Sequence, residues 1–132
     1  MSEFRAGRTP TIRETLLQRL HDGRILAGQL EASESGRTAW IGIYPLDLSN
    51  PHTHEGLRRE GLAVIPVATP RAYRIQMFEI VNELRETFFG DRDMTNQWSC
   101  IVIGDDALFE RLADRGISVE CLDSPRRVDY PL

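Results

Sequence analysis

The sequence contains no lysine, because all sixteen of its basic residues are arginine. This absence excludes a Schiff base, a lysine general base and the lysine of a phosphate-binding loop. The motifs Gly-x-Ser-x-Gly, Gly-x-Gly-x-x-Gly and Cys-x-x-Cys are also missing. The common catalytic and nucleotide-binding motifs are therefore absent, and a role other than catalysis is favoured without being decided.

Long apolar runs are missing as well. The longest ones have the length of a strand, far short of the roughly 20 residues that a membrane-spanning helix needs. The first residues are charged and polar, where a secretory signal would be apolar. We therefore expect a soluble, cytoplasmic protein without membrane contact, and arginine-only usage is typical of a GC-rich bacterial genome.

Cysteine is scarce. The chain has two, Cys100 and Cys121, each flanked by apolar residues, and such cysteines usually act as small buried hydrophobes. Neither has zinc-ligand spacing around it. Two free thiols fit a reducing compartment.

The net charge of −4 is unevenly distributed. Residues 1–66 carry eight acidic residues and eight arginines, whereas residues 67–132 carry twelve acidic residues and eight arginines. Nucleic-acid binding needs a concentrated positive face, so nucleic acid is not expected to be the main partner. A basic protein partner suits this balance better.

Trp98 to Leu122 gives the strongest indication of fold. An apolar run meets a Gly-Asp-Asp turn, a short helix ends at Gly116, and a second apolar run follows. This order predicts a β-α-β unit with parallel strands, and a similar pattern from Trp40 to Val67 indicates a second unit. We expect an α/β fold, or an α+β fold with a mixed sheet, comprising about five strands and three main helices. Residues 1–123 would form a single domain and residues 124–132 a tail.

Other segments complete this arrangement. Thr11 and Glu14 form a capping box that predicts a first helix, and residues 24–31 and 37–46 read as a β-hairpin. A short helix ends at Gly61, before a strand over residues 62–68.

A longer helix is predicted to begin at Thr69 and Pro70 and to run to about Phe89. Residues 72–78 also fit the period of a strand. As a helix, the segment would carry a solvated acidic stripe comprising Glu79, Glu83 and Glu86.

Potential ligand groups follow two predicted strands. Asp47, His52 and His54, with Glu55, lie after the first of them, and Asp105 and Asp106 lie after the second. If the two loops meet at the carboxyl edge of the sheet, these side chains could hold a divalent metal that activates water or binds phosphate. The alternative is simpler: Asp105 caps a helix, and the histidines are solvated.

Two classes of function follow. The first, which needs no cofactor, is a binding or inhibitory module that masks a basic protein partner, as immunity proteins and antitoxins do. It would use Glu79, Glu83, Glu86 and Tyr130 of the C-terminal tail. The second is a small metal-assisted hydrolase or phosphoryl-transfer enzyme with the metal ligands named above. A sensor of small ligands at the same edge, and homodimerisation, are compatible with the sequence.

Overall fold

The computed structural model describes residues 9–61, 71–84 and 94–131. Its three α-helices and four strands follow in the order α2 (Ile12–His21), β1 (Leu26–Leu30), β2 (Arg37–Pro45), α3 (Pro51–Glu60), β3 (Ala72–Val81), β4 (Thr95–Ile103) and α4 (Asp105–Asp114). Three-residue and four-residue 3-10 helices are η1 (Asn82–Leu84), η3 (Val119–Cys121) and η4 (Pro125–Val128). No helix in these ranges is long and apolar enough to cross a bilayer.

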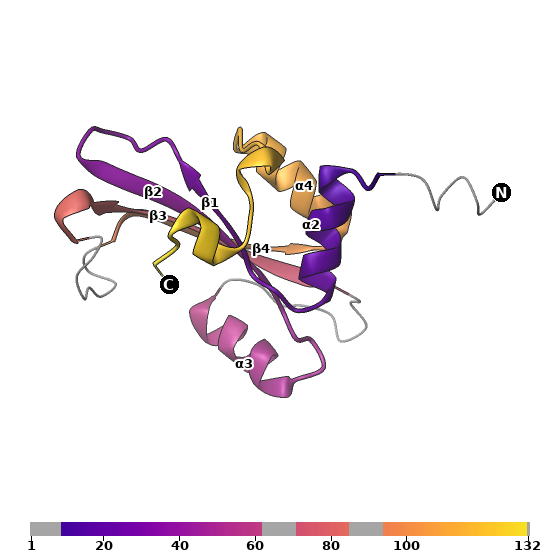
Figure 1. Cartoon of the computed structure of the whole chain (residues 1–132). Helices are drawn as coiled ribbons and strands as arrows, with labels where there is room; N and C mark the ends of the chain where they lie inside the picture. The colour runs from indigo at the N-terminus through magenta and orange to yellow at the C-terminus, as the bar shows by residue number, and fades with distance from the viewer. Residues whose placement is uncertain (1–8, 62–70, 85–93, 132) are drawn as a thin grey trace.

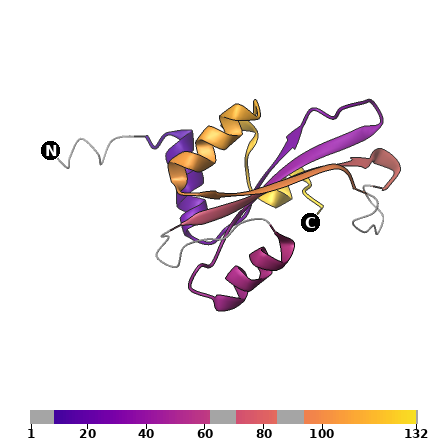
Figure 2. The ribbon, with the colours of Figure 1, turned by 180° about the vertical axis from the view of Figure 1, so that it is seen from behind.

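The strands form one antiparallel sheet in the order β1-β2-β3-β4. Helices α2 and α4 lie together on one face of this sheet, and α3 lies on the opposite side (Figure 1). The view from behind in Figure 2 shows the same layers. The protein is therefore a single small α/β domain, and its hairpin β1-β2 is the one that the sequence predicts.

Successive side chains of the strands point to opposite faces of the sheet, and those of one face form the main core. Ile41 and Ile43 of β2 and Tyr73 and Ile75 of β3 face α2 and α4, and each is at most 1% exposed. Residues of the intervening positions, such as Trp40, pack on the other face. Both faces of the central strands are covered, which explains why β2 has no polar face.

The predicted parallel β-α-β unit is wrong. Strand β4 runs antiparallel to β3, and residues 117–122 form no strand beside it. After α4 the chain passes to the far edge, where Asp123 forms an isolated antiparallel bridge with Ala27 of β1. Ile117 and Leu122 are buried in the core, 9% and 6% exposed, so their apolar character reflects burial without strand pairing. The described sheet has four strands, where about five were predicted.

The predicted helix from Thr69 to Phe89 is also wrong, because residues 72–81 form strand β3. The strand period of Tyr73, Ile75 and Met77 holds, and an irregularity in the β3-β4 register follows between Met77 and Glu79. The predicted strand over residues 62–68 lies outside the described residues.

The C-terminal segment packs on its own sheet. The indole Nε1 of Trp40 donates to the carbonyl oxygen of Val128 at 3.0 Å, and the hydroxyls of Tyr44 and Tyr130 are hydrogen-bonded. Gly42 permits this contact, since a Cβ there would lie 2.7 Å from Cζ of the Tyr130 ring. Residues 124–131 thus cover part of the face that α3 leaves open.

Candidate functional site

Two of the predicted ligand residues flank the start of β3. Strands β2 and β4 both end there, since Pro45 pairs with Tyr73 and Ala72 pairs with Ile103. Asp47 follows β2 and Asp105 follows β4, so the antiparallel sheet brings these two loops to a common end. An open pocket of about 400 Å³ lies here, lined by Asp47, Tyr73 and residues around them.

The two predicted histidines lie elsewhere. Asn50 accepts from the backbone N–H of His52 at 3.0 Å, and with Pro51 it starts α3, so His52 and His54 belong to a helix on the opposite face. His54 Nε2 lies 2.9 Å from the carbonyl oxygen of Leu48. In residues 9–61, 71–84 and 94–131, no three His, Cys, Asp or Glu side chains are grouped to hold a metal ion. The predicted joining of the two histidines with the Gly-Asp-Asp turn is not observed.

The histidine that reaches Asp105 is His21, in the last turn of α2. Its Nε2 lies 3.1 Å from Oδ2 of Asp105, and the Tyr73 hydroxyl donates to Oδ1 at 2.5 Å. Burial, and then the hydrogen bond to Asp105, raise the pKa of Tyr73, so Tyr73 remains a donor at neutral pH. Both oxygens of Asp105 are therefore engaged by protein donors, and the cluster ties α2, β3 and α4 together.

Asp105 is not the N-cap of α4. Gly104, with φ of 92°, holds that position without a side-chain hydrogen bond, and Asp105 is the first helical residue. Asp106 faces solvent, with Arg13 4.0 Å away. His21 was not among the ligand residues predicted from the sequence. The contact with Asp105 needs the packing of α2 against α4, which no local pattern encodes.

The predicted acidic stripe does not exist as a helix face. Glu79 lies in β3, only 8% exposed, and accepts from the backbone N–H and hydroxyl of Ser33 at 3.0 and 2.8 Å. Burial raises its pKa, but these bonds, with Arg37 3.8 Å away, outweigh burial and lower it. Glu79 thus fixes the β1-β2 loop to β3. Glu83 is exposed in η1, and Glu86 lies outside the described residues.

A different acidic row lies on α4. Asp106, Glu110 and Asp114 are spaced by four residues and exposed, so they form one column along the helix, here named the acidic column. Glu110 and Asp114 make no ion pair with any described residue.

Two arginines at the C-terminal end of this helix turn toward the sheet instead. They are Arg111, inside α4, and Arg115, its C-cap. Cζ of Arg115 lies 4.1 Å from the ring centroid of Trp98, and Arg111 is near enough to the Cys100 thiol to oppose the effect of burial on its pKa. Burial raises the pKa of the Cys100 thiol. The outward side of α4 is therefore mainly negative, although the helix carries both signs of charge.

A groove separates this helix from the end of β4. It encloses about 300 Å³ between residues 101–103 on one side and Ala107, Glu110, Arg111 and Asp114 on the other. Ile103, 44% exposed, contributes an apolar wall. Within the described chain β4 has β3 as its one sheet neighbour, and residues 101–103 of the same strand line the groove. We name the outer edge of β4, this groove and the acidic column the β4-α4 surface.

In comparisons with known proteins, no family model matches the chain, and no curated protein or solved structure shows significant similarity to it.

Proposed function

We propose that the protein is a binding module that captures an extended, basic segment of a partner protein on the β4-α4 surface. The segment would add to the outer edge of β4 as a further strand, with its basic side chains toward the acidic column. Masking such a segment would give the module an inhibitory role. The observation that carries this proposal is the position of the acidic column beside an edge strand that carries no charge of its own.

The composition of β4 supports strand addition. Edge strands expose backbone N–H and C=O groups, and proteins usually protect them with charged residues or proline. The nine residues of β4, Thr-Asn-Gln-Trp-Ser-Cys-Ile-Val-Ile, include neither. Strand addition uses backbone hydrogen bonds for affinity and side-chain pockets for specificity.

The charge of α4 supports a basic occupant. Glu110 and Asp114 line the groove without a protein partner in the described chain, so an incoming arginine or lysine would meet carboxylates that no internal ion pair neutralises. Charge complementarity at a solvent-exposed rim mainly speeds association and rejects acidic competitors. The occupant it selects is a basic strand.

The test uses a fluorescein-labelled peptide of alternating valine and arginine, with the length of β4, and measures binding by fluorescence anisotropy. We expect saturable binding that weakens with salt. The double variant Glu110→Gln/Asp114→Asn should weaken it about tenfold, since two rim ion pairs together contribute about 1.4 kcal/mol. The matched control is Glu55→Gln/Glu60→Gln on α3, which removes the same charge.

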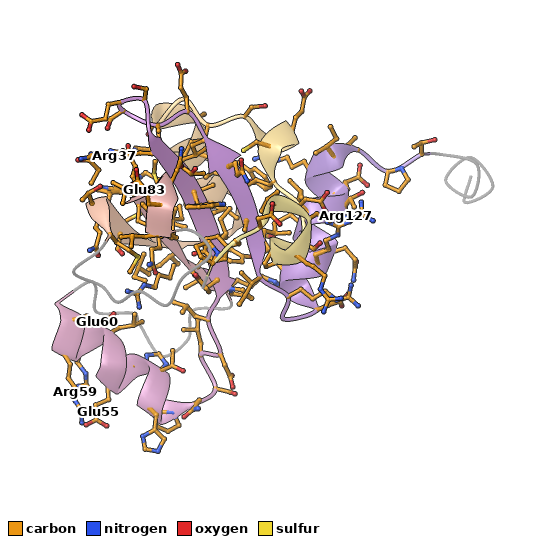
Figure 3. All side chains as sticks on the ribbon, turned by 60° about the vertical axis from the view of Figure 1, so that its left-hand side comes forward. Arg37, Glu55, Arg59, Glu60, Glu83 and Arg127 are labelled. Carbon is orange, nitrogen blue, oxygen red and sulfur yellow. The ribbon has the colours of Figure 1, made fainter. Side chains whose placement is uncertain are left out.

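Those control carboxylates lie outside the groove. Glu55 and Glu60 pair with Arg59 at 2.7 Å and with Arg74 at 3.1 Å, and Figure 3 shows Glu55 and Arg59 together on α3. Binding should change less than twofold in this variant, an effect expected of long-range charge alone.

A second peptide separates strand addition from simple charge attraction. N-methylation of alternate residues keeps every arginine but removes backbone donors, so strand pairing predicts that it abolishes binding. Retained binding by this peptide, or equal binding by a valine-glutamate peptide, would overturn the proposal. So would a protein mass that doubles with concentration while the peptide fails to bind, because a second copy would then occupy the edge.

A further inference from the structure

A cluster of three arginines borders a pocket at the β1 edge of the sheet. The pocket encloses about 500 Å³ between the end of α2, the start of β1 and the C-terminal segment. Its lining includes Arg19, Arg24, Ile25, Asp123 and Arg127. Figure 3 labels Arg127 on η4. We name this site the arginine pocket.

The pocket lining has three guanidinium groups and one carboxylate, which pairs with two of them. Asp123 accepts from Arg19 at 3.1 Å and lies 3.7 Å from Arg127, whereas Arg24 has no acidic partner among the described residues. Two positive charges are therefore left over in a chain whose net charge is −4. This local excess of positive charge favours an anion.

Asp123 organises the pocket. The backbone N–H of Ser124 donates to its Oδ1 at 2.7 Å. This bond, joined by the arginines, holds the pKa of Asp123 below its ordinary value against the opposing effect of burial. The carboxylate is thus ionised at neutral pH and orients the side chains of Arg19 and Arg127. Arg24 is placed beside them, because its backbone N–H bonds the Arg19 carbonyl oxygen at 3.0 Å.

The pocket also has an apolar part. Ile25 is 38% exposed, and Pro125 lies on the side contributed by the tail. Such a wall contributes nothing to binding an inorganic ion, but it can cover the organic part of a larger anion. The lining therefore pairs guanidinium donors with an apolar surface.

We infer that the arginine pocket binds a small phosphorylated organic molecule. Its phosphate would sit on Arg24 and Arg127, and its organic group would lie against Ile25. Guanidinium forks match the geometry of phosphate oxygens, which makes arginine well suited to such recognition. A phosphate monoester carries about −1.5 to −2 charges at pH 7, which matches the two unbalanced positive charges. This inference concerns a surface separate from the β4-α4 surface and does not rest on the proposed function.

Isothermal titration calorimetry with phenyl phosphate tests the inference, because this probe joins a phosphate to an apolar ring. We expect one saturable site, with inorganic phosphate binding several-fold more weakly. Arg24→Gln and Arg127→Gln should each raise Kd about tenfold, as expected for losing a charge-assisted hydrogen bond. Both side chains are at the surface, so thermal unfolding of these variants should match the wild type.

The matched control is Arg126→Gln, which removes the same charge from an exposed neighbour that does not line the pocket. Binding should stay within twofold there. An equal loss in this control would show diffuse electrostatic attraction and overturn the inference, as would no saturable heat at millimolar phenyl phosphate. Equal affinities for inorganic phosphate and phenyl phosphate would overturn the organic part of the ligand, because Ile25 would then contribute nothing. Ile25→Ser sharpens this point: it should weaken phenyl phosphate binding without changing inorganic phosphate binding.

Discussion

At its β1 edge the sheet is closed by the chain's own C-terminal segment, whereas at β4 the described chain adds no further strand. The β1 side has an antiparallel bridge between Ala27 and Asp123, the packed Tyr130 and the arginine pocket. The β4 side has an uncharged strand beside an acidic column. The first side has the hydrogen bond from Trp40 to Val128 and the packed Tyr130, and on the second side Glu110 and Asp114 have no ion-pair partner among the described residues. We infer that the C-terminal segment on the first side stabilises the fold, whereas the β4-α4 surface on the second side recognises the partner segment.

The largest expected contrast in stability is between Trp40 and Ile103. Trp40 is 1% exposed and anchors the tail through Val128, so Trp40→Ala should reduce the free energy of unfolding by about 3–5 kcal/mol. Ile103→Ala, at the β4 edge, should cost about 1 kcal/mol or less because the side chain is 44% exposed. Chemical denaturation measures both. Similar losses at the two sites would contradict the division between a closed edge and an open one.

The next contrast uses two glycines. In Gly42→Ala the new Cβ would collide with the Tyr130 ring, so we expect a loss of about 1–3 kcal/mol and faster hydrogen exchange in residues 125–130. Gly56→Ala, inside α3, meets no atom within 4 Å and should gain about 0.5–1 kcal/mol from helix propensity. A tolerated Gly42→Ala with unchanged exchange would mean that the tail does not hold the β1 side closed.

The sequence predicted the boundaries of helices correctly where a capping residue or a glycine determines them. Thr11 accepts from the backbone N–H of Glu14 at 3.1 Å, as the capping box requires, and Gly61 ends α3 with φ of 67°. Such features depend on neighbouring residues alone.

The wrong predictions concern buried apolar segments, because burial alone does not determine whether a segment is a helix, a strand or a loop. Thr69 and Pro70 suggested a helix start, but residues 72–81 form a central strand, buried on both faces, whose apolar residues fit either period. Ile117 and Leu122 are buried, but the segment between them forms a loop and a 3-10 turn instead of a strand.

The sequence raised the hypothesis that two loops meet at one sheet edge, with a simpler alternative left open. Asp47 and Asp105 follow strands that end beside the start of β3. His21 replaces the expected histidines there, because its contact depends on how two distant helices pack. The i, i+4 spacing of the acidic column is readable in the sequence. The burial of Glu79, in contrast, depends on the sheet register, which the sequence does not reveal.

A smaller effect should appear at acid pH on the β1 side. The pKa of Asp123 is lowered in the folded protein, so its contribution to stability is present above the unfolded pKa of about 3.9 and is lost as pH falls through the folded value. Asp123→Asn should therefore be less stable than the wild type at neutral pH, and the gap should narrow toward about pH 3. Denaturation curves across this range measure it. The matched control, Asp129→Asn, keeps the left-handed conformation that Asn tolerates and removes no ion pair of the described chain.

The smallest expected effect on stability is that of Glu110→Gln/Asp114→Asn. Both side chains are exposed without an ion-pair partner among the described residues, so the free energy of unfolding should stay within about 0.5 kcal/mol. Peptide binding should nevertheless weaken about tenfold in this variant. A large loss of stability would show that the acidic column serves the fold.

Amide hydrogen exchange of β4 with and without the valine-arginine peptide tests the central claim most directly. In an antiparallel strand alternate N–H groups point away from the existing neighbour, so an added strand should protect the outward amides of β4 and leave those bonded to β3 unchanged. We predict this alternating protection across Thr95–Ile103, and its loss with the N-methylated peptide. Binding of the peptide with no change in exchange along β4, or protection confined to β1, would contradict the account.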